Sequence, residues 1–177
     1  MEYDISAARD LGADGVVFGC LTEYGDIDMK AVERLVKAAD GLSVTFHRAF
    51  DMAADPFSAL DRITDSGCNR ILTSGQSPTA EEGISLLGRL VAAAGSRITI
   101  MPGCGISESN IGRIASLTKA REFHFSAREY RPGRMKVFNP NVHMGAPDGD
   151  ERGYYATSSR RVENIIQSLY RETGEPT

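Results

Sequence analysis

The sequence predicts an α/β fold of about five successive strand–helix units, three units short of a closed eight-stranded barrel. Five short apolar runs start about 27 residues apart, the length of one strand, loop and helix. Amphipathic segments fill the intervals, and this regular alternation is typical of a parallel sheet with crossover helices. The five runs are residues 15–19, 42–46, 70–74, 97–101 and 122–126.

Capping residues indicate where the intervening helices begin. Asp28 precedes apolar residues at helical spacing, and Asp55 precedes Pro56, which suits the first position of a helix. Thr79 opens a third helix as part of a capping box, and Ser107 opens a fourth. Further helices are expected over residues 2–11, before the first strand, and over 159–171, as a closing helix.

Residues 128–156 differ from the rest because they are rich in Gly, Pro, Asn and Arg and show little periodicity. We expect a long loop there, and loops of that length commonly carry function. The length of 177 residues suits one domain, so residues 1–177 are interpreted as a single partial barrel with this loop and the closing helix.

The composition favours a cytoplasmic protein. A formal net charge of −4 indicates no basic surface for nucleic acid or anionic lipid, and no apolar run approaches a membrane span. Three widely spaced cysteines, Cys20, Cys68 and Cys104, do not form a disulfide pattern. We therefore expect reduced thiols, and neither a nucleic acid nor a membrane as partner.

Alternation along two of the strands predicts a polar barrel interior. In each strand the larger apolar residues suit the helix side, which leaves the polar ones facing inward. An unpaired buried polar group costs about 1–3 kcal/mol, so these residues either form a hydrogen-bond network or serve a ligand. The inward residues are Ser43, Thr45, His47, Glu122, His124 and Ser126.

The turn after the second strand combines an imidazole, a guanidinium and a carboxylate. His47 could act as acid, base or metal ligand, and Arg48 could bind an anion with Asp51 orienting it. His124, near the end of the fifth strand, is a second candidate acid or base. The alternative is an Arg48–Asp51 pair that only stabilises the turn.

Two further strand ends are candidate ligand sites. Gly103, Cys104 and Gly105 lie between a strand and a helix, where backbone amides can approach a phosphate. Thr73 and Ser74 carry hydroxyls that can donate to a ligand. Tight turns explain both patterns equally well. The expected ligand-binding set is Thr73, Ser74, Gly103, Cys104, Gly105 and Ser126.

Sulfur and imidazole near the strand ends raise the question of a metal. Cys20, Cys104, His47 and His124 are of the types that Cu(I) or zinc favours. No two of them have the spacing of a metal-ligand pair, so the sequence assigns no metal ligands.

Four ordered strings, residues 45–51, 70–75, 101–106 and 122–127, resemble the CutC copper-homeostasis family. The likeness extends from about residue 5 to 145. It implies a TIM (β/α)8 barrel, a cytosolic protein, a homo-oligomer (a dimer or tetramer), and a role in copper homeostasis through Cu(I) binding. It leaves open whether the family has enzyme activity.

The resemblance has two departures. Family members begin with three further strand–helix units, which contain the cysteines proposed to hold copper. Cys20 and Cys104 stand where relatives tend to have small residues. Three explanations are open: a start recorded too late, a fragment or splice form, or two copies that complete each other. We favour the first two.

Three functions follow from these observations. The first is copper handling through Cu(I). The second is an enzyme for a small phosphorylated or carboxylated metabolite, with His47 or His124 as acid/base and Arg48 binding the anion. The third is a truncated, non-catalytic product.

Overall fold

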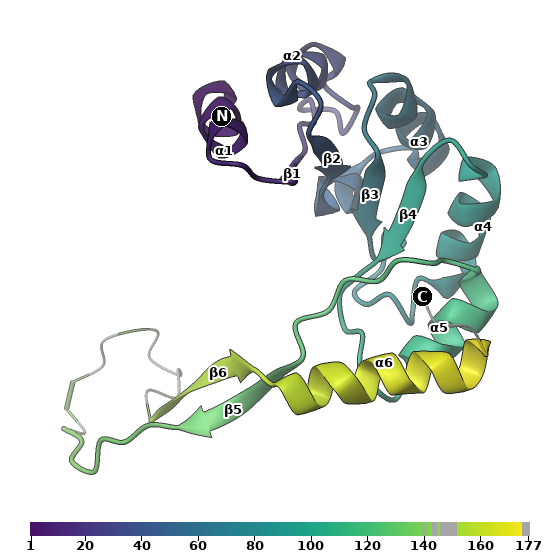
Figure 1. Ribbon diagram of the computed structural model, residues 1–177. Coiled ribbons are helices and arrows are strands. Elements are labelled where there is room, and N and C mark those ends of the chain that lie inside the picture. Colours follow the sequence, from purple (N-terminus) through teal and green to yellow (C-terminus); the bar gives the residue numbers. More distant parts are fainter. Residues whose placement is uncertain (140, 143–144, 146–151, 175–177) are drawn as a thin grey trace.

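A computed structural model describes residues 1–139, 141–142, 145 and 152–174. Four parallel strands form one sheet in the order of the sequence: β1 (Gly15–Phe18), β2 (Ser43–Phe46), β3 (Arg70–Thr73) and β4 (Thr99–Pro102). The strands form an arc with helices along its outer side, as in one part of a barrel wall (Figure 1). All four carboxyl ends meet at one edge, where a site is expected.

Helices connect the strands in the predicted alternation. They are α1 (Glu2–Asp10), α2 (Met29–Ala39), α3 (Pro56–Asp65), α4 (Ile84–Ala94), α5 (Ile111–Thr118) and α6 (Ser159–Thr173), with a 3₁₀ helix, η1 (Arg48–Met52), after β2. Among the described residues, no helix combines the length and the apolar character that crossing a membrane requires.

The outer face of the sheet holds the hydrophobic core. Val44, Phe46, Ile71 and Ile100 are at most 3% exposed and belong to one cluster with apolar residues of the helices. In β3 and β4 the buried residues alternate with half-buried neighbours, following the two-residue period of a strand, whereas in β2 Thr45 is itself buried. Burial of this face against the helices provides most of the stabilisation, as the hydrophobic effect predicts.

The inner face carries the predicted polar network. Arg70, which the sequence did not single out, donates to Ser43 Oγ at 3.3 Å and Thr45 Oγ1 at 3.4 Å. It also forms an ion pair with Glu122, with Arg70 Nη2 at 3.1 Å from Oε1. These residues therefore pair with one another, as in the network alternative.

The predicted helix starts are correct at two positions and early at two. Asp28 Oδ1 accepts from the Ala31 amide at 3.0 Å, and Asp55 Oδ1 accepts from two amides at 2.9 and 2.8 Å. Thr79 Oγ1 accepts from the Glu82 amide at 3.3 Å, as a cap should, and donates to Glu82 Oε1 at 2.8 Å, but these bonds lie in a turn and α4 begins only at Ile84. Likewise α5 begins at Ile111, after a turn that starts beside Ser107. Tertiary contacts, and not the polar residues alone, decide whether such a turn continues into a helix.

The fifth predicted strand, residues 122–126, is wrong as an extended strand. It reduces to one parallel bridge between Gly103 and His124, with the His124 amide 2.9 Å from Pro102 O. Parallel pairing is weak per residue, and within the described part of the chain this segment has no second neighbouring strand. It therefore contacts the sheet only at the site end.

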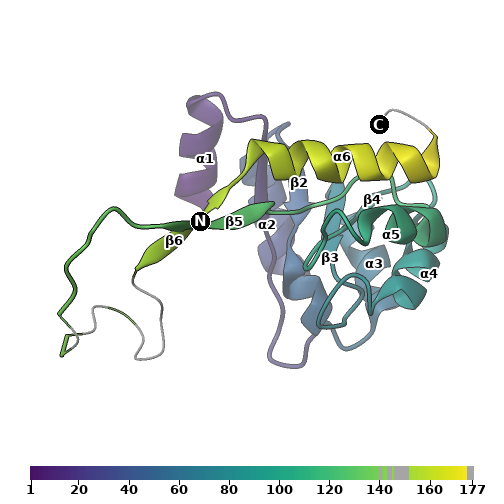
Figure 2. The ribbon, with the colours of Figure 1, turned by 90° about the horizontal axis from the view of Figure 1, so that it is seen from below.

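The loop expected over 128–156 is partly wrong as well. It contains an antiparallel pair, β5 (Arg128–Pro132) and β6 (Gly153–Thr157), which projects from the body as an arm (Figures 1 and 2). Residues 140, 143–144 and 146–151 lie outside the described residues. Tyr130 and Tyr155 face each other across the pair, and such aromatic cross-strand contacts stabilise a ladder.

Candidate functional site

A cavity of about 320 Å³ lies at the carboxyl ends of β3 and β4. Five of the ten residues predicted for the site line it, and the other five support it or lie beside it. The lining residues are Arg48, Leu72, Cys104, Gly105, Ile106, His124, Phe125, Ser126 and Arg128.

Arg48 owes its place to the turn that follows β2. His47 caps η1 by accepting the Ala49 amide on Nδ1 at 3.1 Å. The three-residue spacing in η1 then brings Asp51 Oδ2 within 2.7 Å of Arg48 Nε. Arg48 Nη2 also donates to Ser74 Oγ at 3.0 Å, so two bonds orient this guanidinium.

Asp51 is the most highly coordinated side chain at the site. It accepts from Thr73 Oγ1, from the Ser74 amide at 3.0 Å and from the Gln76 amide at 3.1 Å. Burial raises the pKa of this carboxyl, but the bonds from Thr73, Arg48, Ser74 and Gln76 outweigh burial and lower it. The bond to Asp51 in turn raises the pKa of Arg48. The pair is therefore ionised at neutral pH.

This coordination explains why Thr73 and Ser74 do not line the cavity. Both are fully buried and direct their hydroxyls to Asp51. His47 does not line it either, because its ring packs against Gly19, where a Cβ would lie 2.7 Å from Nδ1. These three residues support Arg48, and the ligand-binding and acid/base roles expected of them stay predictions.

The loop of residues 103–108 after β4, here called the glycine loop, brings its backbone close to the cavity. A Cβ on Gly103 would lie 2.5 Å from Leu72 Cδ1 and 3.3 Å from His124 Cβ, so a glycine allows this approach. The next residue, Cys104, has φ +80° and its thiol donates to Pro78 O at 3.2 Å. The strained backbone thus holds the thiol at the cavity wall.

Two amides of this loop have partners within the protein. The Gly103 amide donates to Thr73 O at 2.9 Å, and the Ser107 amide donates to Asn110 Oδ1 at 2.9 Å. These two amides are therefore occupied within the protein, and the expected binding of a phosphate by the loop amides stays a prediction.

The charge of the cavity is positive. Arg48 and Arg128 line it, whereas no Asp or Glu of the described chain does. The sequence does not place Arg128 at this cavity, because the bridge at His124 that brings the following residues there is a long-range contact. The cavity is also lined by Leu72, Ile106 and Phe125. The sequence gives no signal for them, because apolar residues are expected throughout strands and helices.

A metal centre finds little support among the described residues. They contain no group of three or more His, Cys, Asp and Glu side chains that could hold a metal ion. Cys68 is buried, and burial raises the pKa of its thiol, as it does for Cys20. Cys104 and His124 do share the cavity, which makes them the best-placed soft donors.

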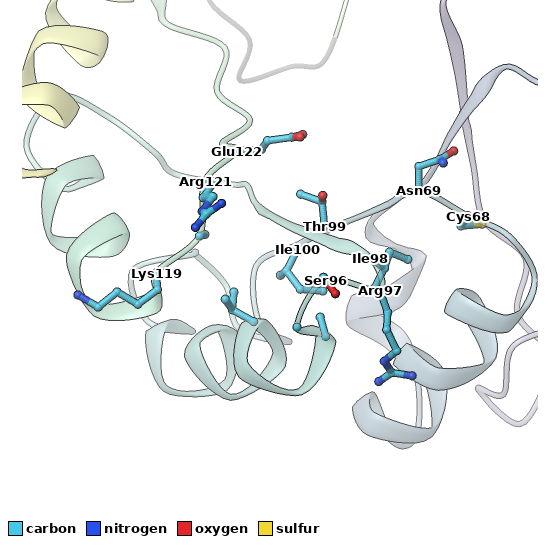
Figure 3. A pocket seen from close by; sticks show the side chains of 14 residues that line it. Cys68, Asn69, Ser96, Arg97, Ile98, Thr99, Ile100, Lys119, Arg121 and Glu122 are labelled. Carbon is cyan, nitrogen blue, oxygen red and sulfur yellow. The ribbon is translucent and has the colours of Figure 1, made fainter. Parts of the chain in front are cut away.

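A larger cavity, of about 580 Å³, lies at the opposite ends of the strands (Figure 3). Figure 3 shows Arg97 and Lys119 directed outward on its two sides, and Arg97 pairs with Asp61 at 3.0 Å. It lies where 119–122 diverges from β4. Sites of this fold lie at the carboxyl ends, so we assign the site to the smaller cavity.

Comparisons with known proteins agree on one family. A model described as the CutC family matches residues 1–129. A family protein CutC of Bacteroides thetaiotaomicron is 55% identical over 170 residues, covering 96% of this chain and 68% of the relative. One of Bacteroides fragilis is 52% identical with the same coverage.

Solved structures show the same likeness. A CutC protein of Streptococcus agalactiae, whose name refers to copper homeostasis, is 36% identical with a TM-score of 0.67, covering 70% of this chain and 60% of that chain. The native KDPGal structure has a TM-score of 0.57 at 15% identity and covers 99% of this chain and 67% of that one, a likeness of fold alone. The predicted TIM-barrel class is confirmed.

Proposed function

The chain belongs to the CutC family, and from this premise we propose that it serves copper homeostasis in the cytoplasm. The support is the name of the streptococcal relative, which refers to that role. The chain spans 60% of that protein's length, and 68% of the relatives from Bacteroides. The activity of the whole relative is therefore a proposal for this chain.

The molecular activity that the geometry supports best is binding of a small phosphorylated or carboxylated metabolite. One observation carries it: Arg48 is oriented by Asp51 and Ser74 at a cavity that no carboxylate of the described chain lines. A guanidinium fixed in this way binds an oxyanion with little loss of side-chain entropy. If the bound metabolite reacts, His124 is the acid or base within the cavity.

Binding of inorganic phosphate, measured by isothermal titration calorimetry, tests this activity. Replacing Arg48 by Met removes the guanidinium and should weaken binding at least about tenfold, the usual loss for a charge-assisted hydrogen bond. Arg62→Met is the matched control, because Arg62 is exposed on α3, away from the cavity. Equal affinities for the two variants would contradict the proposal.

A second candidate is Cu(I) binding, favoured by the thiol of Cys104 and the imidazole of His124 in one cavity. Titration of the reduced protein against a Cu(I) chelator tests it. Cys104→Ala should release the metal to the chelator, whereas Cys68→Ala, a buried thiol elsewhere, should not. If both variants keep the parent's affinity, the cavity is not the copper site.

A further inference from the structure

The segment that forms the Arg128 side of the cavity is held by the end of β6 and the start of α6. Thr157 Oγ1 donates to Ser126 O at 3.1 Å, and the Ser158 amide donates to Ala127 O at 3.0 Å. Arg161 Nη1 donates to Arg128 O. Three consecutive carbonyls of this segment are thus hydrogen-bonded by residues 157 to 161, and the segment itself lines the cavity with Ser126 and Arg128.

Arg161 also binds the glycine loop, on the neighbouring side of the same cavity. Its Nε lies 2.9 Å from Glu108 Oε1 and its Nη2 lies 2.8 Å from Oε2, a bidentate ion pair. Glu108 follows Gly105 and Ile106, which line the cavity. One guanidinium therefore connects the glycine loop to the backbone of Arg128 and maintains their separation.

The two cations that line the cavity come from different strand ends. Arg48 follows β2, whereas Arg128 lies beyond the bridge at His124, on the far side of β4. Arg48 is balanced by Asp51, but the described residues show no ion pair for the Arg128 side chain. A volume of about 320 Å³ exceeds what one phosphate or carboxylate needs.

We propose that the cavity takes a ligand with two separated anionic groups, such as a dicarboxylate or a phosphorylated carboxylate. Arg48 binds one group and Arg128 the other, and Arg161 is the positioning residue that holds Arg128 in place through its backbone and Glu108. This inference rests on the proposed anion-binding function and specifies its ligand class.

Calorimetry with paired probes tests the ligand class. We expect succinate to bind at least about tenfold more tightly than acetate, and phosphoglycolate more tightly than inorganic phosphate. Arg128→Met should abolish this preference, so that succinate binds the variant no more tightly than acetate and phosphoglycolate no more tightly than phosphate. If those monoanions bind but the dianions bind no better, the two-cation inference is wrong. If no probe binds, the proposed function itself fails.

The same preference tests the role of Arg161. Arg161→Met and Glu108→Gln should each reduce the preference for succinate over acetate, without changing acetate binding. Arg161→Lys keeps the positive charge and should retain more of this preference than Arg161→Met. Arg160→Met is the control, because the Arg160 side chain is 80% exposed and forms only a long ion pair, 3.8 Å, with Glu129. If Glu108→Gln lowers the melting temperature but preserves the preference, Arg161 is merely structural.

Discussion

The two cationic sides of the cavity are built in different ways. Arg48 is oriented from three residues away by Asp51, whose side chain is only 8% exposed. Arg128 is held through Arg161 and Glu108, which lie 53 residues apart in the sequence. Turn geometry supports the first side, and the docking of α6 supports the second. Damage to the first should therefore cost stability and binding together, whereas damage to the second should chiefly alter ligand preference.

The largest effect should follow from breaking the first side. Asp51→Ala leaves Arg48 Nε, Thr73 Oγ1 and the Ser74 amide without their acceptor, so we expect the free energy of unfolding to fall by about 3 kcal/mol and phosphate binding to be lost. Urea unfolding measures the change. Asp51→Asn keeps one acceptor oxygen and should lose less. A free energy within about 0.5 kcal/mol of the parent would show that the coordination is dispensable.

An intermediate effect should follow from a change at Gly103, where the two sides meet. The Cβ of Gly103→Ala would press on Leu72 and His124, both of which line the cavity, so we expect a loss of about 1 kcal/mol and weaker anion binding. Thermal melting and calorimetry measure the two effects. Gly88→Ala is the matched control, because in α4 its Cβ would meet nothing closer than 3.5 Å. Similar losses in both variants would contradict the close approach.

The smallest effect should appear on the second side as a dependence on pH. The bond from Arg161 lowers the pKa of Glu108 to about 2, below its ordinary value of 4.5. Between these values the unfolded chain binds more protons, so this pair's stabilisation is complete above pH 4.5 and disappears as the pH falls through 2. Both side chains are partly exposed, which limits the effect to roughly 1 kcal/mol.

Comparison of urea unfolding at pH 3 and pH 6 checks this sign. Glu108→Gln should flatten the acid loss of stability relative to the parent protein. Replacing Asp61, which pairs with Arg97 on the exposed surface, by Asn should leave the acid loss almost unchanged. A parent protein as stable at pH 3 as at pH 6 would show that the ion pair contributes nothing.

Local features of the structure followed from the sequence. The caps at Asp28 and Asp55 and the pairing of Arg48 with Asp51 depend on residues three or fewer positions apart. The apolar runs predicted β1 to β4 because buried parallel strands need such runs on the helix side. Over a separation of three residues, backbone geometry limits which groups a side chain can reach, so such contacts can be predicted from the sequence.

Tertiary structure decided the rest. Whether residues 122–126 extend into a strand depends on a neighbour, and the described chain supplies one bridge, at Gly103. The partner of Glu122 is Arg70, and the partner of Glu108 is Arg161, each more than 50 residues away. The sequence alone therefore determined a series of strand–helix units with an arginine turn at their carboxyl ends. Only packing determined that Arg128 joins that site, because long-range ion pairs leave no periodic signal in a sequence.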